Sequence, residues 1–262
     1  MCLIYFAINK HPEFRFIALA NRDEFYNRAT KPAGFWVEHP DIIGGQDAAV
    51  TIKNQLPGTW LGMTKAGKVS FVTNYRDLKN IKTEAPSRGQ LVTTFLSSDN
   101  HPQEYLNKVA EHAHLYNGFN LVTGIENEFY YYSNIQKKII KLNAGIYGVS
   151  NHLINTAWPK LIKGKNLFEH KLSSGLELNP TELLDLMTNE EIAADSDLPD
   201  TGIGIEKERM LSAMFIKSAN YGTRNTTLIM IQNSGHVNFM ERTYLNDRQK
   251  YQTLKFEFRI NG

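Results

Sequence analysis

The stretch MCLIYFAINKHPEFRFIALANRDEF (residues 1–25) decides the fold. Two runs rich in aliphatic, β-branched and aromatic residues, CLIYFAI (2–8) and FRFIALA (14–20), are typical of buried strands. The segment NKHPE (9–13) between them contains Asn and Pro, which favour a turn, so the two runs are predicted to form a β-hairpin. The second run is expected to lead into a polar loop, ANRDEFYNRATKPA (20–33), in which Arg, Asp and Glu are crowded together.

The rest of the chain alternates between groups of strands and groups of helices. A second hairpin is predicted from Trp60–Thr64 and Val69–Thr73, joined by KAGK (65–68), whose glycine supplies a positive φ. Helices are expected after Ser87, over about 102–114, near 157–172, over 179–187 and, in helical or mixed form, over 204–216. Further strands are expected over 119–125, 128–133, 137–142, 145–150, 226–232, 236–244 and 251–258. This order favours an α+β class, with helices layered on antiparallel sheets.

Composition limits the classes of protein to consider. A chain of 262 residues can bury a sizeable core without a disulfide or a metal, and we expect one domain over 1–262. The net charge of +2 argues against a nucleic-acid partner. The N-terminal apolar run is short and has no basic segment ahead of it, and no stretch reaches the length of a membrane span. A single cysteine fits a reducing compartment, so we predict a cytoplasmic protein.

Cys2, the only cysteine, stands directly behind Met1. If methionine aminopeptidase removes Met1, which the small Cys2 side chain permits, Cys2 carries a free α-amine. Such an amine has a pKa of about 7.7–8.0 and can act as the base for the thiol of the same residue. The alternative is a buried strand residue, because free cysteine is among the most often buried residue types.

Several polar residues near predicted strand ends are candidates for a site around Cys2. Arg22 can stabilise a thiolate and Asp23 can accept from an α-ammonium, although the quartet 21–24 also resembles a solvated turn with a weak ion pair. Amides held at strand ends, such as those of Asn74 and Asn151, can stabilise an oxyanion by roughly 3–4 kcal/mol, but Asn also ends strands because it tolerates turns. Arg209 and Arg224 are basic candidates later in the chain. Without a role in the site, Arg209 would be a charged residue on a helix surface, and Arg224 would form an ion pair at the start of a strand.

The histidines do not predict a metal site. His112 and His114 are two residues apart in a predicted helix and do not share a face. The sequence contains no HExxH, P-loop or dinucleotide-binding fingerprint, and GIG (202–204) lacks the strand–helix context of the last.

These segments together resemble the NRDE family, known in animals as the Transport and Golgi organization 2 family. The matching pieces spread over nearly the whole chain: MCLIYF, ALANRDEFYNR with KPAGFW, IIGGQD, GTWLG, VTNYR, SRGQLV and YGTRNTT. The resemblance implies a fold similar to the N-terminal nucleophile hydrolases, a four-layer αββα sandwich of two antiparallel sheets flanked by helices.

More remotely, the chain resembles the bile-salt hydrolase and penicillin V acylase group. That resemblance implies a catalytic set of Cys2, Arg22, Asp23, Asn74, Asn151 and Arg209, with Arg224 as the alternative late arginine. In the acylases two residues separate the early Arg and Asp, whereas Arg22 and Asp23 are adjacent. Side chains adjacent on an extended backbone point to opposite faces, so at most one is expected to face Cys2 in the acylase manner. The candidate substrate-binding residues are Asn21, Glu24, Trp60, Tyr75 and Arg224.

Two functions follow as expectations. The first is hydrolysis of a linear amide through a Cys2 thioester, which requires no cofactor. The second, implied by the family resemblance, is a carrier that binds haem or an acyl lipid in the same cleft without chemistry, with aromatic pieces such as GFW and TWLG lining an apolar pocket. A scaffold for protein interaction is a third possibility, which no feature of the sequence favours.

Overall fold

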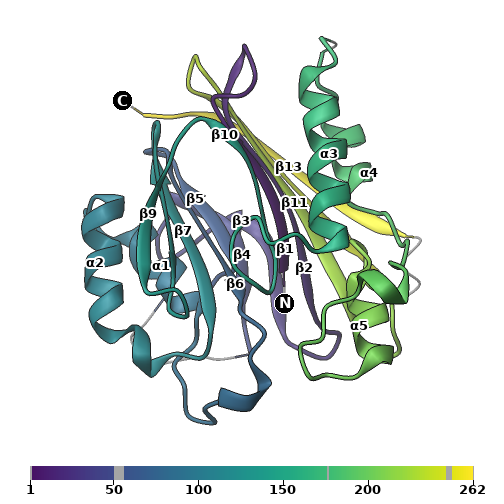
Figure 1. The fold of residues 1–262 in the computed structure, drawn as a ribbon. Helices are drawn as coiled ribbons and strands as arrows, with labels where there is room; N and C mark the ends of the chain where they lie inside the picture. Colours follow the sequence, from purple (N-terminus) through teal and green to yellow (C-terminus); the bar gives the residue numbers. More distant parts are fainter. Residues whose placement is uncertain (1, 50–55, 176, 246–249, 262) are drawn as a thin grey trace. The chain divides into compact units, whose positions relative to one another are not determined.

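A computed structural model describes residues 2–49, 56–175, 177–245 and 250–261. They form two compact units, each built on one antiparallel sheet. Unit 1 comprises Met1–Asn27 and Ala144–Glu257, and unit 2 comprises Arg28–Asn143 and Phe258–Gly262 (Figure 1). The sequence has no long linker at any of the three points where the chain passes from one unit to the other, and the expectation of a single domain stays a prediction.

The sheet of unit 1 brings the first hairpin together with strands from the end of the chain. Its spatial order is β10 (Gly145–Val149), β1 (Cys2–Ile8), β2 (Phe14–Phe25), β11 (Tyr221–Gln232), β12 (His236–Tyr244) and β13 (Tyr251–Arg259). The predicted hairpin is confirmed, and Asn9 takes a positive φ of 50° in its turn. The expectation of a polar loop from residue 20 is wrong, because β2 continues to Phe25 and buries its polar residues Asn21–Asp23.

Strand alternation gives this sheet two distinct faces. One face, here called the helix face, carries Leu3, Tyr5, Ile17 and Leu19, which share a buried cluster with residues of the covering helices. These helices are α3 (Pro159–Ser173) and α4 (Pro180–Leu186), and α5 (Ile205–Ser212) follows the short 3₁₀ turn Asp195–Asp197 (Figure 1). The opposite face carries Cys2, Ile4 and Phe6 and is called the Cys2 face.

The sheet of unit 2 is a meander in which every strand pairs with the next one along the chain. Its order is β3 (Thr30–Phe35), β4 (Ile42–Asp47), β5 (Leu61–Thr64), β6 (Lys68–Asn74), β7 (Phe119–Ile125), β8 (Glu128–Ser133) and β9 (Lys138–Leu142). Helices α1 (Gly89–Ser97) and α2 (Pro102–His112) bury Val92, Phe95 and Leu106 against it. The hairpin predicted around KAGK is confirmed, with Gly67 at φ 87°.

Helix ends follow the capping chemistry in part. Asn179 caps α4 as expected, because its Oδ1 accepts from the Thr181 backbone N–H at 2.9 Å. Ser87 does not cap α1: the helix begins at Gly89, and Arg88 holds the N-cap position without a side-chain bond. The short 3₁₀ turns Leu78–Asn80 and Ala113–Leu115 lie ahead of α1 and after α2.

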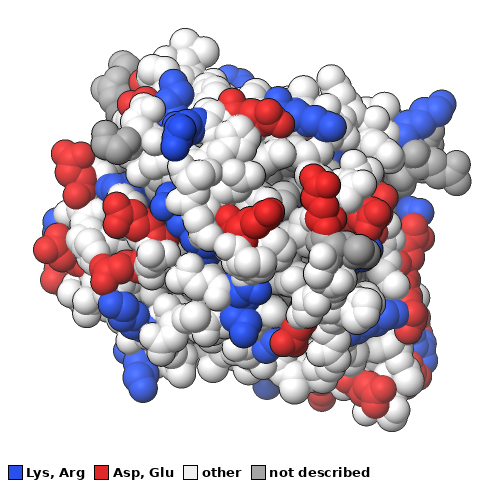
Figure 2. Space-filling view, turned by 90° about the horizontal axis from the view of Figure 1, so that it is seen from above, with Lys and Arg blue, Asp and Glu red and all other residues white. Residues whose placement is uncertain are grey.

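The surface charge is mixed (Figure 2), and the helices are too short or too polar to cross a membrane in the part of the chain that the structure describes. Figure 2 shows Lys and Arg interspersed with Asp and Glu over the face that it presents, in keeping with the net charge of +2. Across the described ranges, none of the helices combines the length and the apolar character needed to cross a bilayer.

Candidate functional site

Cys2 begins a row of polar residues that crosses the sheet of unit 1. In the ladder registers Cys2 lies opposite Arg22 on β2, Arg22 lies opposite Asn225 on β11, and Asn225 lies opposite Thr243 on β12. Directly opposite residues in an antiparallel pair project from the same face. The hairpin and the return of the C-terminal strands therefore place these four side chains on the Cys2 face, and Cys2, Arg22 and Asn225 are buried.

Asn151 lies near the start of β1. The β1–β10 register ends with Ile4 opposite Val149, and Asn151 is the second residue after β10. The neighbouring Ser150 fixes this corner, because its Oγ donates to the Cys2 carbonyl oxygen at 3.1 Å and approaches Asn151 Oδ1 at 3.3 Å. Asn151 is buried, and the proximity of its amide to the Cys2 thiol stays a prediction.

The surroundings of Cys2 act on its thiol in opposite directions. Burial raises the pKa of the Cys2 thiol above its ordinary value, because a thiolate loses hydration there. The negative charges of Asp23 and Glu24 raise this pKa further, whereas the Arg22 guanidinium lowers it. Because burial has the largest effect, the resting thiol is protonated at neutral pH and needs a base before it can react.

Asp23 points to the helix face, as strand alternation predicts for the residue after Arg22. Its Oδ1 accepts from Thr223 Oγ1 at 2.7 Å, and Thr223 Oγ1 accepts from the Ile216 backbone N–H at 2.9 Å. Burial raises the pKa of the Asp23 carboxyl, and the positive charge of Lys160 on α3 partly offsets this increase. Arg22 and Asp23 thus act on Cys2 from different sides of the sheet.

Asn21 also lies on the helix face, where its amide holds secondary-structure elements together. Its Nδ2 donates to the carbonyl oxygens of Met187 and Met214, both at 2.9 Å, and its Oδ1 accepts from Thr226 Oγ1 at 2.6 Å. The side chain is fully buried. The structure therefore does not bring Asn21, a predicted substrate-binding residue, onto the Cys2 face.

The other candidates of unit 1 are engaged elsewhere or lie at its edge. Arg209 is partly exposed on α5 and forms ion pairs with Asp195 and Glu206, as expected of a charged residue on the surface of a helix. Arg224 is the extra residue of a β-bulge between Thr223 and Asn225, and its Nη1 donates to the Phe25 carbonyl oxygen at 3.2 Å. Glu24, near the end of β2, accepts from the Phe25 backbone N–H at 2.9 Å.

Three predicted site residues belong to unit 2. Trp60 is buried, and its ring lies so close to Gly45 that a Cβ there would approach the ring to 2.3 Å. Asn74 ends β6 opposite Phe119. The Tyr75 backbone N–H donates to the Gly118 carbonyl oxygen at 2.9 Å. These positions assign Trp60 to the packing of its own sheet.

The Cys2 face contains further buried polar residues that the sequence analysis missed. Asn225 belongs to the row described above, and Thr227 and Glu241 face each other one row further along β11 and β12. Glu241 is 1% exposed, and Thr227 Oγ1 donates to its Oε2 at 3.4 Å. Their signal in the sequence is a run of consecutive polar residues in TRNTT (223–227) and MERTY (240–244), inside strands that are otherwise rich in apolar residues.

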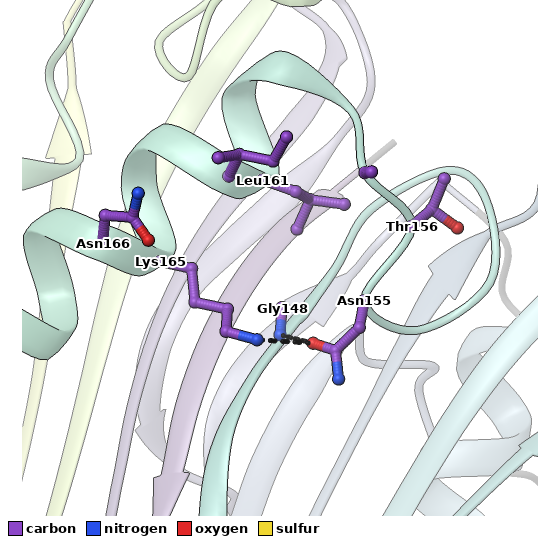
Figure 3. A pocket seen from close by; sticks show the side chains of 8 residues that line it. Gly148, Asn155, Thr156, Leu161, Lys165 and Asn166 are labelled. Carbon is purple, nitrogen blue, oxygen red and sulfur yellow. Dashed lines mark hydrogen bonds between the residues drawn. The ribbon is translucent and has the colours of Figure 1, made fainter.

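A small pocket of unit 1 lies away from this row. It has a volume of about 180 Å³ between the loop 155–157 and α3. Figure 3 shows Lys165 pointing toward Asn155 in this pocket, with Nζ and Oδ1 3.5 Å apart. Leu161 of the helix-face cluster lines it, so it opens on the helix side of the sheet. No group of three or more potential metal-ligating side chains occurs among the residues that the structure describes.

Comparisons with solved structures place the fold. The chain superposes on the C2A mutant of conjugated bile acid hydrolase from Clostridium perfringens with a TM-score of 0.51 and 9% identity, covering 100% of this chain and 97% of the hydrolase. A variant of the same hydrolase gives a TM-score of 0.52 at 9% identity, covering 99% and 98%. The predicted α+β class with an N-terminal nucleophile hydrolase-like fold is confirmed.

Comparisons of sequence place the family. The mouse Transport and Golgi organization 2 homolog is 37% identical over an alignment of 284 positions, which covers 100% of both chains. The family model described as Transport and Golgi organisation 2 matches residues 1–246. The motifs from MCLIYF to YGTRNTT and the end-to-end match agree, and the chain belongs to the Transport and Golgi organisation 2 family.

Proposed function

We propose that this protein is an N-terminal cysteine hydrolase that cleaves a linear carbon–nitrogen bond of an amide after Met1 is removed. The observation that carries the proposal is the position of Cys2, which lies opposite Arg22 of β2 and accepts a hydrogen bond at its carbonyl oxygen from Ser150, the residue before Asn151. A nucleophile, a cation and an amide donor on one sheet face are the groups that acyl transfer needs. The likeness of the fold to a conjugated bile acid hydrolase, solved as a C2A mutant, supports it.

The chemistry begins with a proton transfer within Cys2. Because burial keeps the thiol protonated, the free α-amine takes the thiol proton, and the sulfur attacks the amide carbonyl carbon. A carbon–sulfur bond forms. The carbon–nitrogen bond then breaks, and the leaving amine takes the proton from the α-ammonium. Water next attacks the thioester with the α-amine as base, the carbon–sulfur bond breaks, and the carboxylic acid and the thiol are released.

Two neighbours of Cys2 have separate tasks in this reaction. Arg22 favours the negatively charged sulfur, in line with its lowering effect on the thiol pKa. The Asn151 amide donates to the oxyanion of the tetrahedral intermediate, a role worth about 3–4 kcal/mol in a well-built site. Asn74 was predicted for the same role, and its place in unit 2 leaves that as a prediction.

The experiment tests whether hydrolysis requires a free α-amine on Cys2. Three forms of the full chain are compared on a panel of acyl p-nitroanilides: processed protein that begins at Cys2, protein in which an added lysine after the start methionine prevents its removal, and Cys2→Ala. We expect hydrolysis only with the processed form, while circular dichroism shows the same fold for all three. Equal activity of the form that retains its start methionine would exclude the mechanism.

A further inference from the structure

Asn225 has a buried side-chain oxygen for which no described residue supplies a hydrogen bond. The residue is 2% exposed, and its Oδ1 has no hydrogen-bond partner among the described residues. A buried polar atom without a partner costs stability, and native proteins retain few of them without a functional reason. The other asparagine of β2–β11, Asn21, is fully bonded by comparison.

The backbone around Asn225 is built to aim it at the Cys2 face. A β-bulge at Arg224 shifts the register between Thr223 and Asn225, so that Asn225 comes opposite Arg22. Bulges are common next to active sites, where they redirect a side chain. If the same sequence paired without a bulge, Arg224 would come opposite Arg22 and Asn225 would point toward the helices.

The polar neighbours of Asn225 define which chemical group would complement it. Thr227 follows it on the same face, and Glu241 on β12 accepts from Thr227 Oγ1 at 3.4 Å. Apart from the Arg22 guanidinium opposite Asn225, this part of the face offers acceptors: a carboxylate, a hydroxyl oxygen and the Asn225 carboxamide oxygen. A group that donates a hydrogen bond fits there, whereas a purely apolar group would leave Asn225 Oδ1 unsatisfied.

We propose that Asn225 is a substrate-recognition residue whose Oδ1 accepts a hydrogen bond from an N–H or O–H group of the substrate. Two strand spacings separate Asn225 from Cys2, roughly 10 Å between backbones, so this donor lies away from the bond that is cleaved. The preferred substrate is then an amide with a second, hydrogen-bond-donating polar group. This inference rests on the proposed function, because it takes the Cys2 face as the substrate site.

Binding to a protein that cannot react tests this without any need for turnover. Full-length Cys2→Ala protein is titrated with a series of linear amides from butanamide to decanamide, and with the same amides carrying a terminal hydroxyl. We expect one chain length at which the hydroxyl tightens binding by about tenfold, as one buried hydrogen bond would. The side-chain amide signal of Asn225 in ¹H–¹⁵N spectra should shift with that ligand.

Variants of two asparagines test which residue causes the tighter binding of the hydroxylated amides. Asn225→Leu in the Cys2→Ala background should abolish it, and Asn225→Ala serves the same purpose if the leucine variant does not fold. Asn238→Leu is the matched control: Asn238 Oδ1 also has no partner among the described residues, but the residue faces the helices through its pairing with Met230. Asn238→Leu should keep the preference.

The outcomes separate this inference from the proposed function. Absence of a hydroxyl preference at every chain length, or a preference that survives in Asn225→Leu, overturns the role of Asn225. Neither result touches the hydrolysis tested with acyl p-nitroanilides. Conversely, inactivity of the processed protein together with a preference that depends on Asn225 would support a binding site on the Cys2 face and reject the reaction.

Discussion

Cys2 lies directly opposite Arg22 in the antiparallel β1–β2 ladder, and both side chains are buried on the same face of the sheet. This pairing follows from the hairpin, since the register that puts Ile8 opposite Phe16 also brings the start of the chain to residue 22. Burial and the negative charges nearby raise the thiol pKa, and Arg22 is the side chain that lowers it. The pair therefore links the fold to the proposed chemistry.

Removing the charge of Arg22 should make Cys2 less reactive near neutral pH. Because the guanidinium lowers the thiol pKa, Arg22→Gln raises it, and the rate of alkylation by iodoacetamide should reach its midpoint at a higher pH. Amide hydrolysis at pH 7 should fall by about a hundredfold. Arg22→Lys should restore the midpoint in part, and Arg15→Gln, at the far end of β2, should leave it in place. An unchanged midpoint in Arg22→Gln would contradict the role given to Arg22.

Asp23 should make folding stability depend on pH. Its folded-state pKa is raised by burial, so between the ordinary value of about 3.9 and the raised value the folded state binds more protons than the unfolded state. Stability contributed by Asp23 is thus present below pH 4 and lost as the pH rises through the folded pKa. Asp23→Asn retains an acceptor for Thr223 and should be more stable than the native chain at pH 7.

Urea unfolding at a series of pH values measures this difference. The advantage of Asp23→Asn should vanish on acidification to below pH 4, and Asp41→Asn, at an exposed position, should show no such trend. A variant that is less stable than the native chain at pH 7 would mean that the attraction of Lys160 outweighs the burial of Asp23.

Asn21 should matter for stability more than for chemistry. Asn21→Leu leaves two buried carbonyl groups, of Met187 and Met214, without their donor, and should lower the free energy of unfolding by about 3 kcal/mol. Asn27→Leu, at an exposed position after β2, should change it by less than about 0.5 kcal/mol. Equal urea midpoints for the two variants would show that the bonds of Asn21 contribute nothing measurable.

The carrier alternative predicts a different result with haem. Iron binds cysteine as the thiolate, and the raised pKa of the buried Cys2 thiol makes that form scarce near neutral pH. We therefore expect no saturable Soret shift when the processed protein is titrated with haem. A saturable shift that Cys2→Ala abolishes would favour the carrier.

The sequence predicts the strands and helices of this fold well because their periodicity is local. The hairpin 2–20 and the helix after Asn179 follow from alternation, turn residues and capping. The end of β2 could not be predicted in this way. Asn21, Arg22 and Asp23 look like a solvated loop until β11, from the other end of the chain, pairs with them and supplies Thr223 and Thr226 as partners.

Only the part of the candidate site that depends on local alternation could be predicted from the sequence. Alternation on an extended backbone sufficed to separate Arg22 from Asp23, and the structure confirms that separation. Asn225 and Glu241 could not be recognised from the sequence because their place on the Cys2 face depends on strand order and, for Asn225, on the bulge at Arg224. Arg209 resembled a catalytic arginine because it follows a turn, but its guanidinium forms ion pairs with Asp195 and Glu206.

The most direct test of the account is the intact mass of the protein before and after exposure to a thiol-directed acylating probe. We predict a chain that lacks the start methionine and gains one acyl group, which Cys2→Ala does not take up and which hydroxylamine removes, as expected of a thioester. Circular dichroism should show Cys2→Ala folded as the native chain is. A native chain that keeps Met1 in full and is still acylated, or a processed chain whose Cys2 stays unmodified, would contradict the claim that Cys2 is an N-terminal nucleophile.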